Sequence, residues 1–274
     1  MHETAYAKIN LALHVRAREL DGYHRIETLF AFAEDGDGLI VEECDSFTLN
    51  VDGAFAQDLG GERDNLVIRA ALALQGAFNV RSGAGLTLDK KLPVASGIGG
   101  GSADAAAALR LLTRWWGLPA TDADLIEIGR TLGADVAACV RSETCRGIGR
   151  GDHLVSQDGS GLAGMPLLLV NPGAAVATRH VFEGWDGVDR GELPIASPLA
   201  TALGGRNDLE LPALRFAPEI KQVLAALGGA RRARMSGSGA TCFALYEREE
   251  ERDEASNALA ALHPQWWRMA TRLR

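Results

Sequence analysis

A glycine-rich run, PVASGIGGGSA, occupies residues Pro93 to Ala103 and leads directly into a segment of high helical propensity. Glycines let successive backbone N–H groups converge, because no Cβ blocks the approach and positive φ is accessible. A helix that starts after the loop adds unpaired N–H groups and the positive end of its dipole. The sequence therefore predicts a phosphate-binding loop, with Ser102 as the helix cap and as a hydroxyl within reach of a phosphate or Mg²⁺.

This loop departs from two familiar nucleotide-binding patterns. No Gly-Lys-Ser/Thr ends it, as a Walker A sequence would. GIGGGS also lacks the strand-Gly-x-Gly-x-x-Gly spacing of dinucleotide-binding folds. The alternative is a flexible surface turn, and the coincidence of a cap, a helix and the upstream lysines Lys90 and Lys91 argues against it.

Strands and helices are mixed along the rest of the chain. Alternating apolar residues, or short apolar runs between turn signals, predict strands at residues 4–16, 26–33, 39–43, 47–51, 86–88, 165–170 and 240–246. Apolar residues at helical spacing predict helices at residues 65–78, 102–116, 121–132, 219–227 and 249–262, the first capped by Asp64 or Asn65. Residues 183–205 are rich in Gly, Pro and Asp and predict a long loop. We expect an α+β protein with two lobes, residues 1–150 and 151–274.

Composition limits the partners of the chain. Of the 274 residues, 47% are hydrophobic and 23% are charged, which is ordinary for a globular protein. The net charge of -8 and the isoelectric point of about 5.3 argue against a nucleic-acid-binding surface, which is usually basic. We expect a small-molecule ligand and no nucleic acid, because a few cations and backbone amides suffice to bind the phosphates of a nucleotide.

The N-terminus and the cysteines favour the cytoplasm. Lys8, Asn10 and His14 interrupt the N-terminal apolar stretch, so it does not resemble a secretory signal. No apolar run reaches the roughly 20 residues that span a bilayer, so we expect no membrane association. Without CxxC spacing, the cysteines are expected to be reduced, small buried residues: Cys44, Cys139, Cys145 and Cys242.

Two charged residues lie in apolar surroundings. Lys8 lies on the apolar strand predicted at 4–16, where a buried lysine is costly unless paired. Asp135 lies at a helix end and enters the apolar run 136–138, predicted as a strand. Phosphoryl transfer to an alcohol needs cations for the moving charge and a group that receives the hydroxyl proton. Both residues are candidates; the alternative for each is a half-exposed structural role, and their spacing leaves open whether they pair.

Together these features resemble the GHMP kinase superfamily, which includes galactokinase, homoserine kinase, mevalonate kinase and phosphomevalonate kinase. Its three motifs have counterparts in the strand with Lys8, the loop Pro93–Ala103 and a later glycine loop, Met235–Gly239. Five segments also follow the order of the branch that phosphorylates 4-diphosphocytidyl-2-C-methyl-D-erythritol: AYAKINLALHV, DGYH at 21–24, LGADV at 132–136, NDLE at 207–210 and MSGSG. The resemblance spans nearly the whole chain, and AKINL with DGYH is its most specific part.

The resemblance implies a fold and a reaction. It implies a two-lobed GHMP kinase fold, with a ribosomal protein S5 domain 2-like N-terminal lobe and a ferredoxin-like α/β C-terminal lobe. ATP would phosphorylate the 2-hydroxyl of the cytidylyl substrate, with Mg²⁺, in the non-mevalonate isoprenoid pathway. Asp135 would take the hydroxyl proton, Lys8 would pair with Asp135 and stabilise the nascent alkoxide, and Asn10 would orient the substrate. Proton transfer from a tertiary alcohol should be late, so positioning and charge neutralisation should supply most of the acceleration.

The resemblance also assigns binding residues. Tyr23 offers a ring face to cytidine, and His24 offers ring nitrogens to the base edge. Phe182 would be a second aromatic wall and Thr178 a substrate contact. The alternative for Tyr23 and His24 is a surface turn, and the alternative for Phe182 is a place in the core. The ATP-binding set comprises Pro93, Val94, Ala95, Ser96, Gly97, Ile98, Gly99, Gly100, Gly101, Ser102, Ala103, Asn65 and Lys90.

Some positions depart from the family pattern. Ala103 replaces a usual second serine, which leaves the hydroxyl of Ser102 as the candidate Mg²⁺ contact. Ser96 and Ile98 stand where small residues or leucine are common, and Ala137 stands where proline is usual. Two other functions stay open: a homoserine- or mevalonate-type kinase, and a non-catalytic nucleotide-binding relative. We expect a monomer or a weak homodimer.

Overall fold

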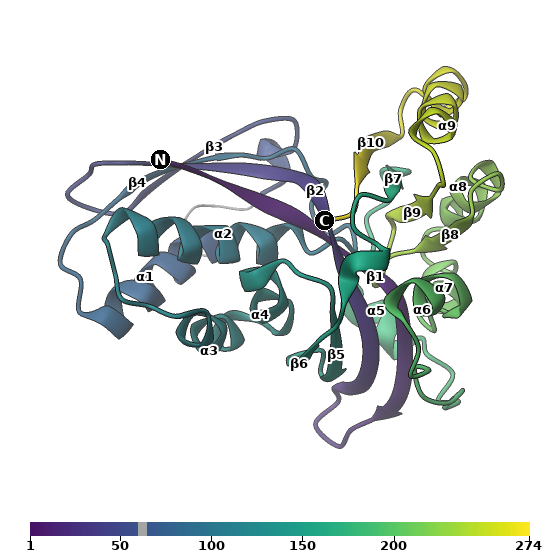
Figure 1. The fold of residues 1–274 in the computed structure, drawn as a ribbon, viewed down its shortest axis with the longest axis horizontal. Helices are drawn as coiled ribbons and strands as arrows, with labels where there is room; N and C mark the ends of the chain where they lie inside the picture. The colour runs from purple at the N-terminus through teal and green to yellow at the C-terminus, as the bar shows by residue number, and fades with distance from the viewer. Residues whose placement is uncertain (60–64) are drawn as a thin grey trace. The chain divides into compact units, whose positions relative to one another are not determined.

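The computed structural model describes residues 1–59 and 65–274, in two compact units that are interleaved in sequence (Figure 1). Unit 1 holds residues 1–7, 35–94 and 99–142, and unit 2 holds residues 8–34, 95–98 and 143–274. Two long paired strands, β1 (His2–Arg18) and β2 (His24–Glu42), contribute residues to both units. The compact units are divided along these two strands and are not continuous in sequence. The expected division into lobes 1–150 and 151–274 stays a prediction.

Unit 1 combines helices with a small sheet. β3 (Thr48–Asp52) pairs in parallel with β4 (Gly85–Asp89), which pairs antiparallel with residues 38–42 of β2. The helical elements are η1 (Ala56–Asp58), α1 (Leu66–Phe78), α2 (Gly100–Trp115), α3 (Asp122–Leu132) and α4 (Ala134–Arg141). α2 packs against α1 and α4, and α3 packs against α4. Buried alanines on α2 favour the helix and let its neighbours approach closely.

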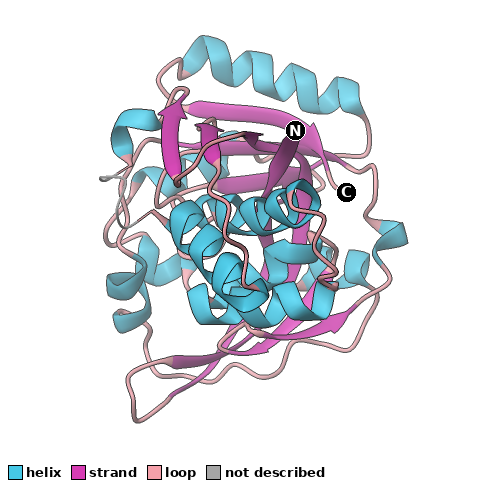
Figure 2. Cartoon of the chain, turned by 90° about the vertical axis from the view of Figure 1, so that its left-hand side faces the viewer, coloured by secondary structure: helices cyan, strands magenta, loops and turns pink. Residues whose placement is uncertain are grey.

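Unit 2 contains a second sheet of order β10-β7-β9-β8, antiparallel throughout. Its strands are β7 (Pro166–Asn171), β8 (Arg232–Met235), β9 (Cys242–Leu245) and β10 (Trp267–Arg272). Residues 26–30 of β2 pair with β5 (Cys145–Gly149), which pairs with β6 (His153–Ser156). The helices are η3 (Gly159–Gly161), α5 (Thr178–Glu183), α6 (Pro198–Gly204), α7 (Glu210–Ala213), α8 (Glu219–Ala226) and α9 (Glu249–Leu262). α9 lies along the sheet, against β7 and β10 (Figure 2).

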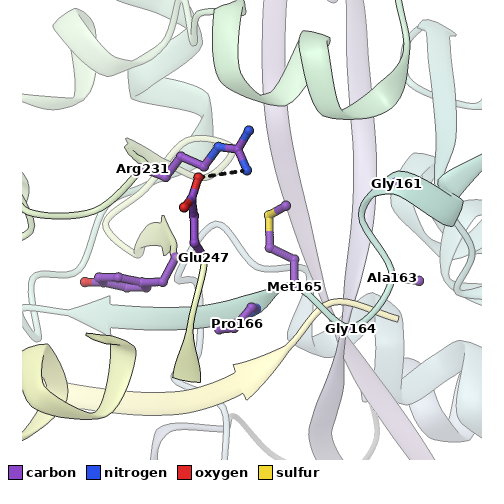
Figure 3. Close-up of a pocket in the computed structure, with 8 residues that line it drawn as sticks. Gly161, Ala163, Gly164, Met165, Pro166, Arg231 and Glu247 are labelled. Carbon is purple, nitrogen blue, oxygen red and sulfur yellow. Dashed lines mark ion pairs between the residues drawn. The ribbon is translucent and has the colours of Figure 1, made fainter. Parts of the chain in front are cut away.

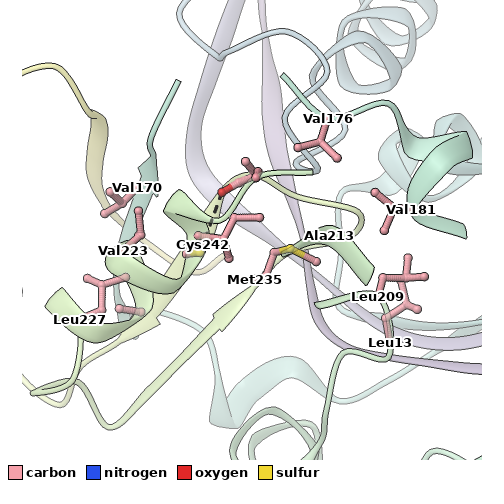
Figure 4. Packing of buried hydrophobic residues seen from close by; sticks show 14 of the residues in the cluster. Leu13, Val170, Val176, Val181, Leu209, Ala213, Val223, Leu227, Met235 and Cys242 are labelled. Atoms are coloured by element: carbon pink, nitrogen blue, oxygen red, sulfur yellow. Dashed lines mark hydrogen bonds between the residues drawn. The ribbon is translucent and has the colours of Figure 1, made fainter. Parts of the chain in front are cut away.

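The core of unit 2 lies between this sheet and its helices. Leu13, Val170, Met235 and Cys242 belong to one buried cluster (Figure 4). Every residue of β7 is buried, in keeping with its apolar run from Pro166 to Val170, and the side chain of Asn171 at its end is hydrogen-bonded. Burial raises the pKa of the Cys242 thiol, as expected for a core residue. All four cysteines are free, and three are buried as predicted, whereas Cys44 is only partly buried.

The predicted break between strands 26–33 and 39–43 is wrong. β2 runs continuously through the Asp-Gly-Asp-Gly cluster at residues 35–38. A Cβ on Gly36 would lie 1.9 Å from the carbonyl oxygen of Ala5. The absence of a side chain therefore lets β1 lie close to β2 at this position, and Gly36 does not form a turn. The predicted strand at 136–138 is also wrong, because these residues belong to α4. The loop expected at 183–205 contains α6. No helix among the described residues is long and apolar enough to cross a membrane.

Candidate active site

The glycine segment in unit 1 ends at the start of α2. Gly99 is the N-cap with φ 64°, and no side chain caps the helix. The prediction of Ser102 as the cap is therefore wrong, because left-handed Gly99 lets the helix begin earlier, at Gly100. The N–H of Ala103 makes the first helical bond, to the carbonyl of Gly99 at 2.8 Å. The amides from Gly100 to Ser102 are thus outside the hydrogen-bond ladder of the helix, as an anion-binding terminus requires.

Lys90, assigned to ATP by the resemblance, lies in a buried ion cluster of unit 1. Its side chain is 1% exposed, and the ammonium donates to Asp37 at 2.5 Å and to Asp104 at 2.7 Å. Burial, together with the negative charge of Asp37, raises the pKa of the Asp104 carboxyl to about 8, although the positive charge of Lys90 acts to lower it. Burial opposes the charged form of Lys90, but the two carboxylates outweigh it and raise the lysine pKa. The structure thus gives Lys90 carboxylate partners inside the unit.

Asn65 begins α1 as the sequence predicted. Its Oδ1 accepts a hydrogen bond from the N–H of Val67 at 2.9 Å, which is the usual capping interaction. The alternative cap, Asp64, lies outside the described residues. The position of Asn65 near the adenine nucleotide stays a prediction.

Asp135 lies in the first turn of α4, in unit 1. Its side chain is partly buried, and the positive end of the helix dipole favours the carboxylate there. Lys8 belongs to unit 2, so the pairing of the two residues stays a prediction.

In unit 2, Lys8 and Asn10 lie on the same face of β1, as strand periodicity requires. Lys8 Nζ donates to Asn10 Oδ1 at 2.9 Å and lies 4.8 Å from the ring centroid of Phe30. Asn10 Nδ2 donates to Thr28 Oγ1 at 2.8 Å, and that hydroxyl donates to the carbonyl of Ala12 at 2.7 Å. Lys8 and Asn10 are both buried, so this chain of bonds fixes the orientation of the amide.

The later glycine loop contacts the first one within unit 2. Ser236 Oγ accepts from the N–H of Asn10 at 3.1 Å and donates to the carbonyl of Gly97 at 2.9 Å. A Cβ on Gly97 would lie 2.4 Å from the carbonyl oxygen of Ser236, so the contact requires glycine. Asn207 Nδ2 donates to the carbonyls of Met235 and Gly237, at 2.9 and 2.8 Å. Sequence reasoning gave no role to Ser236 or Asn207, although the NDLE and MSGSG motifs contained both.

Aromatic rings gather around His24 in unit 2. The ring centroids of His24 and Phe182 lie 5.1 Å apart, so the structure brings these two predicted pocket residues together. Trp185, which the sequence did not single out, meets the His24 ring edge-on at 5.8 Å. Burial, together with the charge of Arg18, lowers the pKa of His24 and favours the neutral ring. A neutral imidazole offers one donor and one acceptor, as recognition of a base edge needs.

Tyr23 and Thr178 complete the predicted substrate set. Tyr23 is 58% exposed, and the guanidinium of Arg150 lies 4.0 Å from the centroid of its ring. Arg150 also pairs with Asp21, so the DGYH turn is held to the loop after β5. Thr178 is the first residue of α5, and its hydroxyl lies 2.9 Å from that of Ser238 in the later glycine loop.

A cavity of about 300 Å³ lies beside the β10-β7-β9-β8 sheet of unit 2 (Figure 3). Its lining includes Met165, Tyr246 and the ion pair between Arg231 and Glu247, whose atoms lie 3.5 Å apart. The lining residues include none of the predicted site residues. This cavity is therefore separate from the predicted substrate residues of the same unit.

The fold and the paired glycine loops define a GHMP kinase. The profile for the GHMP kinases N terminal domain matches residues 65–143, and the profile for GHMP kinases C terminal matches residues 190–265. The expected α+β GHMP fold is thereby confirmed.

Full-length relatives refine this assignment. The 4-diphosphocytidyl-2-C-methyl-D-erythritol kinase of Rhizorhabdus wittichii is 57% identical, covering 100% of this chain and 96% of the relative. The protein of that name from Sphingopyxis alaskensis is 51% identical, covering 100% and 99%. A crystal structure of 4-(cytidine 5'-diphospho)-2C-methyl-D-erythritol kinase superposes with a TM-score of 0.84 at 35% identity, covering 100% and 99%. The chain belongs to the 4-diphosphocytidyl-2-C-methyl-D-erythritol kinase family of GHMP kinases.

Proposed function

We propose that this chain transfers the γ-phosphoryl group of ATP to the 2-hydroxyl of 4-diphosphocytidyl-2-C-methyl-D-erythritol, in the non-mevalonate isoprenoid pathway. The observation that carries the proposal is full-length similarity, at 57% and 51% identity, to relatives named for that substrate. ATP is the donor that membership of the GHMP kinase family implies.

The proposed chemistry assigns one role to each of three residues. Asp135 accepts the proton of the 2-hydroxyl while the oxygen attacks the γ-phosphorus. The bond from that phosphorus to the β–γ bridging oxygen breaks, and ADP leaves with the electron pair. Lys8 stabilises the charge that develops on the attacking oxygen, and Asn10 orients the substrate. The buried bond from Lys8 to Asn10, at 2.9 Å, supports a fixed arrangement of these two polar groups.

The start of α2 is the proposed site of the ATP phosphates. The backbone amides from Gly100 to Ser102 lie in the first turn of α2 and are available to bind an anion there, where the helix dipole favours negative charge. Among the described residues, no group of three or more His, Cys, Asp or Glu could hold a metal ion. Mg²⁺ usually takes few protein ligands and several phosphate and water oxygens, so the lone hydroxyl of Ser102 suits it. Bound to ATP, the ion would neutralise phosphate charge.

The aromatic group of unit 2 is the proposed cytidine site. We assign base stacking to Tyr23 and Phe182 and base-edge hydrogen bonding to His24. The contact between the His24 and Phe182 rings, at 5.1 Å, supports a shared pocket. Thr178, whose hydroxyl meets Ser238, is the proposed further substrate contact.

We also propose that the protein is cytoplasmic, is a monomer or a weak homodimer, and does not bind nucleic acid. Four free cysteines support a reducing compartment, and the net charge of -8 supports the absence of a nucleic-acid surface.

A panel of alcohols tests the substrate assignment. The purified protein is incubated with ATP, Mg²⁺ and, separately, the cytidylyl substrate, homoserine or mevalonate, and ADP release is measured. We expect turnover of the cytidylyl substrate alone. Turnover of homoserine or mevalonate instead would favour another GHMP kinase, and ATP binding without any turnover would favour a non-catalytic relative.

A further inference from the structure

The ion cluster of Lys90, Asp37 and Asp104 joins three segments of unit 1. Asp37 lies on β2, Lys90 follows the end of β4, and Asp104 lies on α2. In sequence, Lys90 stands three residues before Pro93, and Asp104 directly follows Ala103. The cluster therefore connects the two ends of the nucleotide-binding segment through one ammonium group.

The entry to the segment is also fixed through the backbone. Asp37 Oδ1 accepts hydrogen bonds from the amides of Lys91 and Leu92, at 2.6 and 2.8 Å. The amide of Lys90 donates to the carbonyl of Asp52 at 2.7 Å. Asp37 thus binds the chain just before the segment with one oxygen and the Lys90 ammonium with the other.

The exit of the segment lies directly beside the same ammonium. A Cβ on Gly100, the first residue of α2, would lie 3.0 Å from Lys90 Nζ. Asp104 Oδ2 accepts from Nζ at 2.7 Å, one turn further along the helix. A displacement of the helix start would stretch this bond, because all three side chains are buried and close packing limits their movement.

We infer that Lys90, Asp37 and Asp104 are positioning residues that hold both ends of the ATP-binding segment, so that the helix-start amides present a fixed site to phosphate. This inference rests on the proposed function. This role differs from a direct nucleotide contact by Lys90, because its side chain is 1% exposed and two of its three ammonium donors bind carboxyl groups in the core.

The test uses Asp104→Asn at a pH above 8, where the wild-type carboxyl, with its pKa of about 8, is ionised. The substitution keeps the shape of the side chain and removes its charge. We expect KM for ATP to rise about tenfold, which corresponds to the loss of one charge-assisted hydrogen bond. KM for the cytidylyl substrate should stay within about twofold of the wild-type value. Calorimetric titration with ATP alone should show the same weakening. Amide hydrogen exchange should quicken in residues 91–92 and 99–103 of the nucleotide-free protein. Asp89→Asn is the matched control, since it removes an exposed ion pair with Lys91 from the same segment.

The inference is overturned if folded Asp104→Asn keeps its ATP affinity and amide exchange, or if both KM values rise equally. Asp37→Asn is the second variant, because its amide oxygen still accepts from the backbone; it should also weaken ATP selectively, and unchanged ATP binding would count against the cluster. Inactivity of the wild-type protein with the cytidylyl substrate would contradict the proposed function, and the exchange and ATP titration would still test the cluster.

Discussion

The backbone amide of Asn10 donates a hydrogen bond of 3.1 Å to the hydroxyl of Ser236, a residue 226 positions later in the chain. Ser236 is fully buried, and its hydroxyl donates in turn to the carbonyl of Gly97. One side chain of the later glycine loop therefore connects the proposed substrate-orienting residue to the middle of the first glycine loop.

Ser236→Ala should remove this connection. The amide of Asn10 and the carbonyl of Gly97 would lose a buried partner, which costs about 1–3 kcal/mol of unfolding free energy. Misplacement of Asn10 should also lower kcat, by about tenfold if Asn10 orients the reacting group. Urea unfolding and steady-state kinetics measure both effects. The exposed serine variant Ser82→Ala is the control, and equal behaviour of the two variants would show that Ser236 positions nothing.

Asp135→Asn separates the proposed base from the binding machinery. The amide cannot accept the hydroxyl proton, so kcat should fall by at least roughly 100-fold while the affinity for ATP changes little. Asp122→Asn, which alters an aspartate with a 66% exposed side chain in the same unit, should retain wild-type turnover. Unchanged kcat in Asp135→Asn would remove this residue from the mechanism.

Tyr23→Ala tests the proposed cytidine site. Loss of a stacking ring should weaken the cytidylyl substrate by about 1–3 kcal/mol, with no matching effect on KM for ATP. Tyr23→Phe keeps the ring and should keep substrate affinity. If the alanine variant retains both kcat and KM for the substrate, the ring is structural and serves the contact with Arg150.

His14 should make stability depend on pH. The ring is buried, and burial, with the charge of Arg206, lowers its pKa below the ordinary 6.5 despite a bond to the carbonyl of Gly191. The unfolded chain therefore binds the proton more readily, so the contribution of His14 is present above 6.5 and is lost as pH falls below it.

The measurement is the unfolding free energy between about pH 7.5 and pH 5.5. His14→Gln should lose less stability over this range than the wild-type protein, whereas the exposed-residue variant His153→Gln should follow the wild type. Identical slopes for all three proteins would contradict the assigned effect of burial on His14.

Local patterns predicted the glycine loop, the alanine-rich helix and the strand with Lys8, because each is written in adjacent residues. The exact start of α2 was missed, since a left-handed glycine and a serine cap both suit the sequence around Gly99 and Ser102. Residues 136–138 were assigned to a strand because a short apolar run suits either element.

Contacts between distant residues account for the rest. Asp37 and Asp104 lie 53 and 14 positions from Lys90, so nothing near the lysine in sequence indicated a buried ion cluster. The residues around Gly36 favour a turn, and only its contact with Ala5, which is distant in sequence, explains why a glycine stands within the strand. The role of Ser236 depends in the same way on β1, which the sequence separates from it by most of the chain.

The central claim is tested most directly by identifying the product. The purified protein is incubated with ATP, Mg²⁺ and 4-diphosphocytidyl-2-C-methyl-D-erythritol, and the reaction is followed by phosphorus NMR and mass spectrometry. We expect ADP and a substrate that has gained one phosphate as a monoester on the 2-oxygen. An unmodified substrate beside an active control kinase, or a phosphate on a different oxygen, would contradict the proposed function.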